Sequence, residues 1–173
     1  MGNTLEGLFK EAITEYIANN YEKSIEYLKL VLQMDPQHRL AGLTIGSALL
    51  KLGRAEKALE QFNHIIEADP GYARAYHLRG FAHQQLGDSE AALKDFSTAI
   101  HLDGEYGAAY YSRATLLSEL GKSELAGDDI EVVTRLTNRN LEVFGNQNNV
   151  WRSRQLYVES EMGSEFDQMV GSA

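Results

Sequence analysis

The chain has 173 residues, of which 43% are apolar and 24% are charged, a balance that is typical of folded globular proteins and not of disordered chains. Its 25 acidic residues outnumber its 16 basic residues, and the formal net charge of −9 disfavours nucleic acid and anionic membranes as partners. The sequence contains no cysteine, which excludes disulfides, thiolate metal sites and cysteine nucleophiles.

The N-terminal segment does not resemble a targeting sequence. Residues 1–20 contain three glutamates and one lysine, and they lack the basic start and the apolar core of a secretory signal. The most apolar window, 40–52, has only 13 residues, whereas a membrane-spanning helix needs about 20. We therefore expect no membrane insertion and a cytoplasmic protein.

A period of 34 residues dominates the sequence, and we call the positions that it links a column. Asp35-Pro36 and Asp69-Pro70 are one period apart. Four further columns are Asn19, Gly53, Gly87 and Gly121; Ala12, Gly46, Gly80 and Ala114; Ser24, Ala58, Ala92 and Ala126; and Leu28, Phe62, Phe96 and Ile130. The period predicts four units, which span 5–38, 39–72, 73–106 and 107–140.

The third unit shows why each unit is expected to be a pair of helices. Tyr76, Arg79-Gly80 and His83 lie at helical spacing, and a second stripe of apolar residues follows over 92–100. Gly87 stands where the first helix needs a residue in the left-handed conformation to end. Asp88 can then accept a hydrogen bond from the free amides of the second helix. In the preceding unit, Pro70 ends the second helix because proline has no N–H to continue it.

Two glycines lie in the middle of predicted helices. Gly46 and Gly80 each cost roughly 1 kcal/mol relative to alanine at such a position. We expect them to allow a close approach between two helices, with the column that contains Ala92 facing them. The bulky column that contains Phe96 is then expected to fill the gap between neighbouring units. These predictions assign packing roles, not chemistry.

This pattern resembles the tetratricopeptide repeat family, whose 34-residue helix-turn-helix units carry small, aromatic and proline residues at fixed positions. Gly42 departs from that pattern, because a large residue is expected near the start of the second unit. The resemblance implies an all-α fold, an α-α superhelix or right-handed solenoid of four helix-turn-helix repeats with a C-terminal capping segment. The third unit matches best, through Tyr76, Gly80, Gly87, Ala92, Phe96 and Ala99.

In this family the first helices of successive units line a concave groove, and that register implies which residues contact a ligand. The set is apolar or aromatic in the first two units and more polar after them: Phe9, Ile13, Tyr16, Leu43, Leu50, Arg74, His77, Phe81 and Tyr111. We predict a non-catalytic protein–protein interaction scaffold that binds a peptide or partner helix in this groove. The alternative is a homo-oligomeric scaffold that assembles through the apolar N-terminal groove or the C-terminal tail.

Some relatives hold a C-terminal carboxylate in a clamp of lysine, asparagine and arginine side chains from three successive first helices. Of the positions that match the clamp, only Arg74 has the expected chemistry. We therefore predict weak or absent binding of acidic C-terminal chaperone peptides. In one frame the matching positions are Phe9, Ile13, Thr44, Arg74 and Leu78, and in the next they are Leu43, Ser47, Leu78, Ala108 and Ser112.

No constellation of catalytic residues is present. Gly121-Lys122-Ser123 resembles the end of a phosphate-binding loop, but Leu116 occupies the place of the required earlier glycine. The five histidines form neither an HExxH motif nor close helical pairs with carboxylates. We predict no enzymatic activity, no bound metal and no cofactor.

The repeat ends after Asn140, and 141–173 is predicted to be a non-repeat cap or tail. Residues 150–162 are expected to form one more helix, in which Trp151 covers the exposed face of the last unit. That role is favoured over a contact between Trp151 and a ligand. The alternative for the end of the tail is a short motif that binds the groove of another molecule, carried by Phe166, Met169 and Val170.

Overall fold

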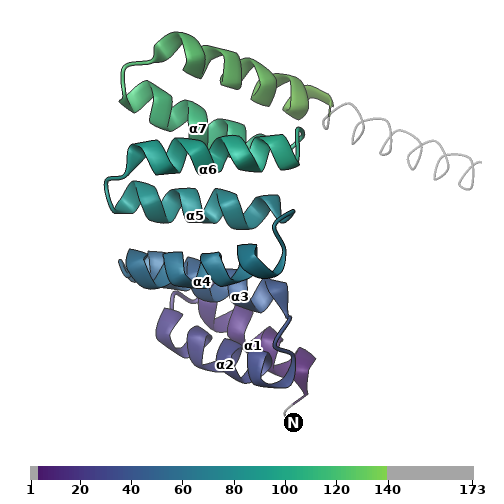
Figure 1. The fold of residues 1–173 in the computed structure, drawn as a ribbon. Coiled ribbons are helices and arrows are strands. Elements are labelled where there is room, and N and C mark those ends of the chain that lie inside the picture. The colour runs from purple at the N-terminus through teal and green to yellow at the C-terminus, as the bar shows by residue number, and fades with distance from the viewer. Residues whose placement is uncertain (1–3, 140–173) are drawn as a thin grey trace, which may run out of the picture. The chain divides into compact units, whose positions relative to one another are not determined.

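The computed structural model describes residues 4–139, all of whose regular structure is helical. The predicted cap or tail at 141–173, including Trp151, lies outside these residues. The chain divides into two compact units, Met1–Ile130 and Glu131–Ala173, and the contacts below are those of the first. A helix without a label covers 123–139. The labelled helices are α1 (Leu5–Ile17), α2 (Tyr21–Met34), α3 (Arg39–Lys51), α4 (Ala55–Ala68), α5 (Ala73–Gln85), α6 (Ser89–Leu102) and α7 (Gly107–Glu119) (Figure 1).

Consecutive helices of Met1–Ile130 pack against one another from α1 to α7, and α3 also contacts α5 (Figure 1). Each helix is followed by the next after a short turn, as the 34-residue period predicts. The prediction of an all-α superhelix of helix pairs is therefore confirmed. The division into units at 38, 72 and 106 stays a prediction.

The turns inside the helix pairs follow the column that contains Gly87. Asn19, Gly53, Gly87 and Gly121 have φ angles of 62°, 70°, 80° and 75°, in the left-handed region. Gly87 follows the last residues of α5, and its amide donates to the carbonyl of Gln84 at 3.0 Å. The Oδ1 atom of Asp88 accepts from the amide of Ala91 at 3.0 Å, at the start of α6. Both predicted capping roles are confirmed.

The interior glycines face aromatic rings. A Cβ atom on Gly46 would lie 2.3 Å from Cε1 of Phe62, and one on Gly80 would lie 2.5 Å from Cε1 of Phe96. These distances are far shorter than van der Waals contact, so each glycine is required by the ring opposite it. The predicted close approach is confirmed. Each phenylalanine faces the glycine of its own helix pair, and Phe96 also packs in one apolar cluster with Leu116 of α7, in the next unit.

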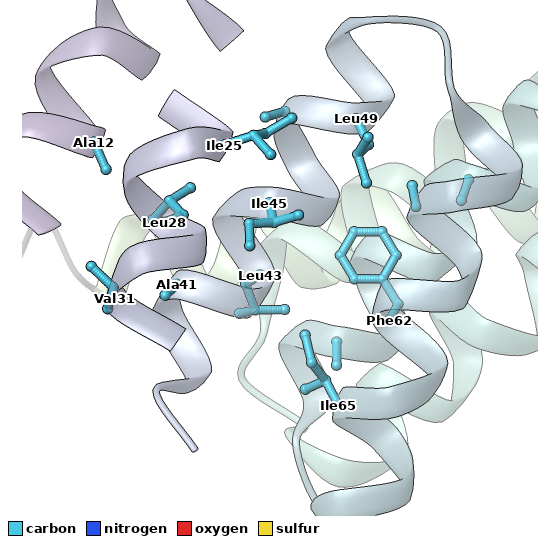
Figure 2. Packing of buried hydrophobic residues seen from close by; sticks show 14 of the residues in the cluster. Ala12, Ile25, Leu28, Val31, Ala41, Leu43, Ile45, Leu49, Phe62 and Ile65 are labelled. Atoms are coloured by element: carbon cyan, nitrogen blue, oxygen red, sulfur yellow. The ribbon is translucent and has the colours of Figure 1, made fainter. Parts of the chain in front are cut away.

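The main apolar core joins α1 to α5, and Figure 2 shows the ring of Phe62 extending from α4 toward the side chains of α3. Small residues bring the helices close together. In the first pair, the hydroxyl of the fully buried Ser24 donates to the carbonyl of Ala12 at 2.8 Å, which links the two small-residue columns directly. Further along the chain the apolar clusters are smaller, such as the one that contains Ala92, Phe96 and Leu116.

Candidate functional site

The first helices of the pairs, α1, α3, α5 and α7, are neighbours in space. The side-chain amide of Gln85 in α5 donates to the carbonyl of Leu50 in α3 at 3.3 Å. The side-chain amide of Gln84, also in α5, donates to the carboxylate of Glu119 in α7 at 3.3 Å. At the α1 end, the Phe9 ring lies 4.7 Å from the His38 ring, which caps α3. The outward side chains of these four helices therefore belong to one surface, which we call the first-helix face.

The nine predicted groove residues differ in how much surface they offer. Arg74 and Tyr111 are exposed, and Tyr111 retains 59% of its accessible area. Leu43 and His77 are buried, at 3% and 6%. The remaining five, all on α1, α3 and α5, are half-buried: Phe9, Ile13, Tyr16, Leu50 and Phe81.

Leu43 and His77 belong to one column with Phe9 and Tyr111, and their burial has a physical cause. Leu43 is part of the apolar core that joins α1 to α5. His77 lies where α5 meets α7, with its ring between the hydroxyl of Tyr106, just before α7, and the hydroxyl of Ser112 in α7. Both side chains thus serve mainly in packing, and they offer a ligand little surface.

His77 is held by two hydrogen-bonding groups. Its Nε2 atom lies 2.9 Å from the hydroxyl of Ser112, and that hydroxyl donates to the carbonyl of Ala108 at 2.9 Å. We infer that Nε2 carries the proton and donates to Ser112, and that the hydroxyl of Tyr106 donates to Nδ1, 2.9 Å away. Burial, assisted by the positive charge of Arg74, lowers the pKa of His77 to about 4. The imidazole is therefore neutral at pH 7.

Leu40, an apolar residue of the first-helix face, was missed when the groove was assigned from the sequence. It is 47% exposed and stands one period before Arg74. The signal that could have identified it is the column itself: Arg74 is exposed, so an apolar residue at the same position is expected to be exposed too. Ile17, which the register of the first helices does place on this face, is 74% exposed and stands one period before Lys51.

The first-helix face changes its chemistry along the chain. On α1 and α3 its most exposed apolar side chains are Ile17 and Leu40, and the charged residues Glu6 and Lys51 are also exposed there. On α5 and α7 it carries Arg74, Gln85 and the phenol of Tyr111. Within residues 4–139, Arg74 forms no ion pair, so its guanidinium is free to meet a carboxylate.

A second charged feature, which the sequence analysis did not anticipate, lies inside the helix pairs. Arg79 of α5 donates from Nε and Nη2 to both carboxylate oxygens of Asp95 in α6, at 2.8 and 2.7 Å, and this hydrogen bonding raises the pKa of Arg79. Its guanidinium also lies 5.2 Å from the ring centre of Tyr76. One period later, Arg113 bonds Asp129 in the same way. In each pair the guanidinium and the carboxylate neutralise one another, and their hydrogen bonds hold two helices together.

Two of the positions that would form a carboxylate clamp hold residues that are engaged within the protein. Leu78 packs against the main core, and the hydroxyl of Ser112 is engaged with His77. In the part of the chain that the structure describes, no three histidine, aspartate or glutamate side chains gather as a metal site. None of the helices described combines the length and the apolar character that crossing a bilayer requires.

Comparison with known proteins identifies the repeat. Two models of the family described as "Tetratricopeptide repeat" match residues 16–80 and 73–106. No curated protein sequence matches the chain.

Several solved structures are similar. The "Second TPR of Spaghetti (RPAP3) bound to HSP90 peptide SRMEEVD" shares 34% identity over 60% of this chain and 96% of its own, with a TM-score of 0.54. TTC0263 of Thermus thermophilus, described as a thermophilic TPR protein, shares 20% identity over 78% of this chain and 75% of its own, with a TM-score of 0.71. MamA from Desulfovibrio magneticus RS-1 shares 24% over 79% and 77%, with a TM-score of 0.67. Together with the helix pairs and their 34-residue columns, these matches show that the chain belongs to the tetratricopeptide repeat family.

Proposed function

We propose that the protein is a non-catalytic interaction scaffold that binds a peptide or a partner helix on its first-helix face. The observation that carries this proposal is the set of apolar side chains left exposed on three of the four first helices. Ile17 of α1, Leu40 of α3 and Tyr111 of α7 are each more than 45% exposed, at 74%, 47% and 59%. Aromatic and aliphatic side chains presented in this way are typical anchors for a bound polypeptide.

The chemistry of the face indicates the kind of polypeptide. Apolar side chains of the ligand would contact the α1 and α3 part, around Ile17 and Leu40. A carboxylate further along the ligand would pair with Arg74, the exposed cation on α5. The ligand class is therefore an amphipathic segment with apolar residues toward one end and an acidic group toward the other.

One relative supports the use of a polypeptide ligand and does not identify it. The second TPR of Spaghetti, 34% identical to this chain, is described as bound to an HSP90 peptide. We extend to this chain only the use of a polypeptide ligand, because its clamp positions hold residues such as Leu78 and Ser112.

The proposal is tested by selecting peptides from a random displayed library on the purified full-length chain and measuring their Kd by calorimetry. Tyr111→Ala and Leu40→Ala should each weaken binding about tenfold. Leu30→Ala in α2 and Leu102→Ala in α6 are matched controls, because these leucines are also exposed but lie on second helices. They should leave Kd unchanged. Equal losses in all four variants would contradict the use of the first-helix face.

Self-assembly is the competing use of the same exposed apolar residues, and light scattering of the full-length chain separates the two. A monomer at all concentrations supports a ligand from another molecule. Concentration-dependent oligomers that Leu40→Glu abolishes would replace the proposed function with assembly of identical chains.

A further inference from the structure

A cleft of about 490 Å³ lies between the end of α2, the start of α3 and the second half of α4. It is separate from the proposed ligand surface, because none of the nine predicted groove residues lines it. Its apolar lining comes from α2, the turn after it and α4, and α4 also supplies the polar side chains of Gln61 and His64. The lining residues that matter here are Leu32, Pro36, Gly42, Gln61, His64 and Ile65.

The cleft lies where neighbouring units carry a tyrosine. Gly42 shares its column with Tyr76 and Tyr110, which start the next two helix pairs. Each of those rings is half-buried and lies beneath an arginine, Arg79 at 5.2 Å and Arg113 at 5.8 Å from the ring centre. In the second unit the column supplies only a hydrogen atom, so the space beside α3 has no ring of its own.

The opposite wall closes part of this space. Ile65 of α4 stands one period before Ala99, so the second unit pairs a glycine with a large residue where the third pairs a tyrosine with a small one. A Cβ atom on Gly42 would lie 3.2 Å from Cδ1 of Ile65 and 3.3 Å from Nε2 of Gln61. Both atoms are the far ends of side chains that can rotate, and an open cleft remains beyond them.

The rim carries groups suited to a hydroxyl. The amide of Gln61 is half-buried, and the imidazole of His64 is largely exposed. Arg39 and Asp69, also on the rim, pair with each other at 2.6 Å and so present no net charge. An apolar wall with a neutral polar rim matches a phenol better than it matches a charged or a purely aliphatic group.

We propose that this cleft binds a tyrosine side chain presented by a partner polypeptide, as a second binding site distinct from the first-helix face. The ring contacts Leu32, Pro36 and Ile65, and the hydroxyl bonds Gln61 or His64. The incoming ring thus supplies, beyond Ile65 and Gln61, the aromatic group that the column lacks at Gly42 and carries at Tyr76. This inference extends the proposed function and does not depend on it, because the cleft shares no predicted groove residue.

The direct test titrates p-cresol, the side chain of tyrosine, into the full-length chain while amide NMR shifts are recorded. Saturable shifts at Gly42, Gln61 and His64 are expected at millimolar p-cresol. Toluene lacks the hydroxyl and 4-methylcyclohexanol lacks the aromatic ring, and both should bind more weakly. Shifts of equal size with all three probes, or none with p-cresol, would overturn the proposal.

A variant that supplies its own ring should block the site. Gly42→Tyr combined with Ile65→Ala reproduces the Tyr76 and Ala99 pair of the next unit, and it should weaken p-cresol binding about tenfold or more. Gly42→Ala is the matched control, because it adds the methyl group but leaves most of the cleft open, and it should retain binding.

Should the double variant not fold, Ala68→Leu tests the same site from its exposed rim, where the third unit carries Leu102. This substitution narrows the cleft without changing a buried residue, so weaker p-cresol binding is expected. Unchanged affinity in a folded blocking variant would place p-cresol elsewhere and overturn the assignment.

Discussion

The helix pairs α3/α4 and α5/α6 share their helix lengths and their glycine–phenylalanine contact, but different side chains hold the two helices of each pair together. In each pair the first helix has 13 residues and the second has 14, and a glycine faces a phenylalanine ring. The residues that directly precede the glycine and the phenylalanine differ between the two pairs. Ile45 and Gln61 occupy the positions that Arg79 and Asp95 occupy one period later.

The two solutions differ in what surrounds them. Ile45 is buried in the apolar core that joins α1 to α5. Arg79 instead bonds both oxygens of Asp95 and donates from Nη1 to Asn63 of the preceding pair at 2.8 Å. The smaller apolar clusters of α5 to α7 are thus supplemented by bidentate ion pairs. The contact between glycine and ring fixes how closely the helices approach, whereas the neighbouring position accepts either apolar packing or charge.

The largest effect is expected where the pairs are alike. Gly80→Leu and Gly46→Leu should each reduce the free energy of unfolding by about 3 kcal/mol or more, because even a Cβ atom overlaps the opposing ring. Urea unfolding followed by circular dichroism measures both losses. A parent-like midpoint in either variant would contradict the packing described.

The first helix pair suggests a second substitution that should restore the lost stability. There, Ala12 and Leu28 hold the columns of the glycine and the phenylalanine. Gly80→Ala alone should be destabilised, and adding Phe96→Leu should recover much of the stability, because the smaller side chain makes room for the methyl group. Additive losses in the double variant would argue against a direct contact.

The next effect should appear only where the pairs differ. Asp95→Ala leaves the guanidinium of Arg79 half-buried without its carboxylate and should cost about 3 kcal/mol. The matched control, Gln61→Ala in α4, should cost less than about 1 kcal/mol. Both are measured by urea unfolding.

Exchanging the ion pair for its counterpart sharpens the same comparison. Arg79→Ile combined with Asp95→Gln gives α5/α6 the residues of α3/α4, and it should cost clearly less than Asp95→Ala alone. A double variant that is less stable than Asp95→Ala would show that the residues of α3/α4 cannot replace the ion pair in α5/α6.

A smaller and pH-dependent effect follows from the column that holds Leu43 and His77. The pKa of His77 is about 4 in the folded chain and ordinarily about 6.5, so the unfolded chain binds the extra proton first. Stability from this group is complete above pH 6.5 and is lost as the pH falls toward 4. At pH 4.5 the loss is about 2 kcal/mol.

His77→Gln removes the titrating imidazole and leaves every other titratable group of the chain in place. The difference in unfolding free energy between parent and variant should therefore shrink between pH 7 and pH 4.5, as measured by urea unfolding in matched buffers. A constant difference across that range would mean that His77 is not held neutral by its surroundings.

The smallest signal is expected with a chaperone peptide. The HSP90 peptide SRMEEVD should bind weakly or not at all, since neither α3 nor α5 supplies a clamp beyond Arg74. Fluorescence anisotropy of the labelled peptide measures this. Tight binding that is lost on amidation of the peptide C-terminus would show that the helix register assigned to the groove is incorrect.

The sequence predicts the features of this fold that repeat. The 34-residue period gives the helix pairs, and Gly87 and Asp88 have the capping roles expected of them. Gly46 and Gly80 were assigned to a close helix contact because a mid-helix glycine is otherwise costly. These inferences succeed because they rest on local backbone chemistry that recurs in every unit.

The sequence is less informative where burial depends on the neighbouring unit. Leu43 and His77 share a column with the exposed Tyr111, but Leu43 is buried in the core that joins α1 to α5, and Ser112 on the following first helix bonds His77. The bond between Arg79 and Asp95 joins residues 16 positions apart on two helices, which no single-helix periodicity reveals. The cleft beside Gly42 likewise arises from a missing side chain, whose consequence is seen only with Ile65 in place.

The most direct test of the proposed function is hydrogen–deuterium exchange of the full-length chain with and without a selected peptide ligand. Use of the first-helix face predicts that added protection is concentrated in α1, α3, α5 and α7. Protection concentrated in α2, α4 and α6 instead would contradict the account, because the ligand would then lie against the second helices.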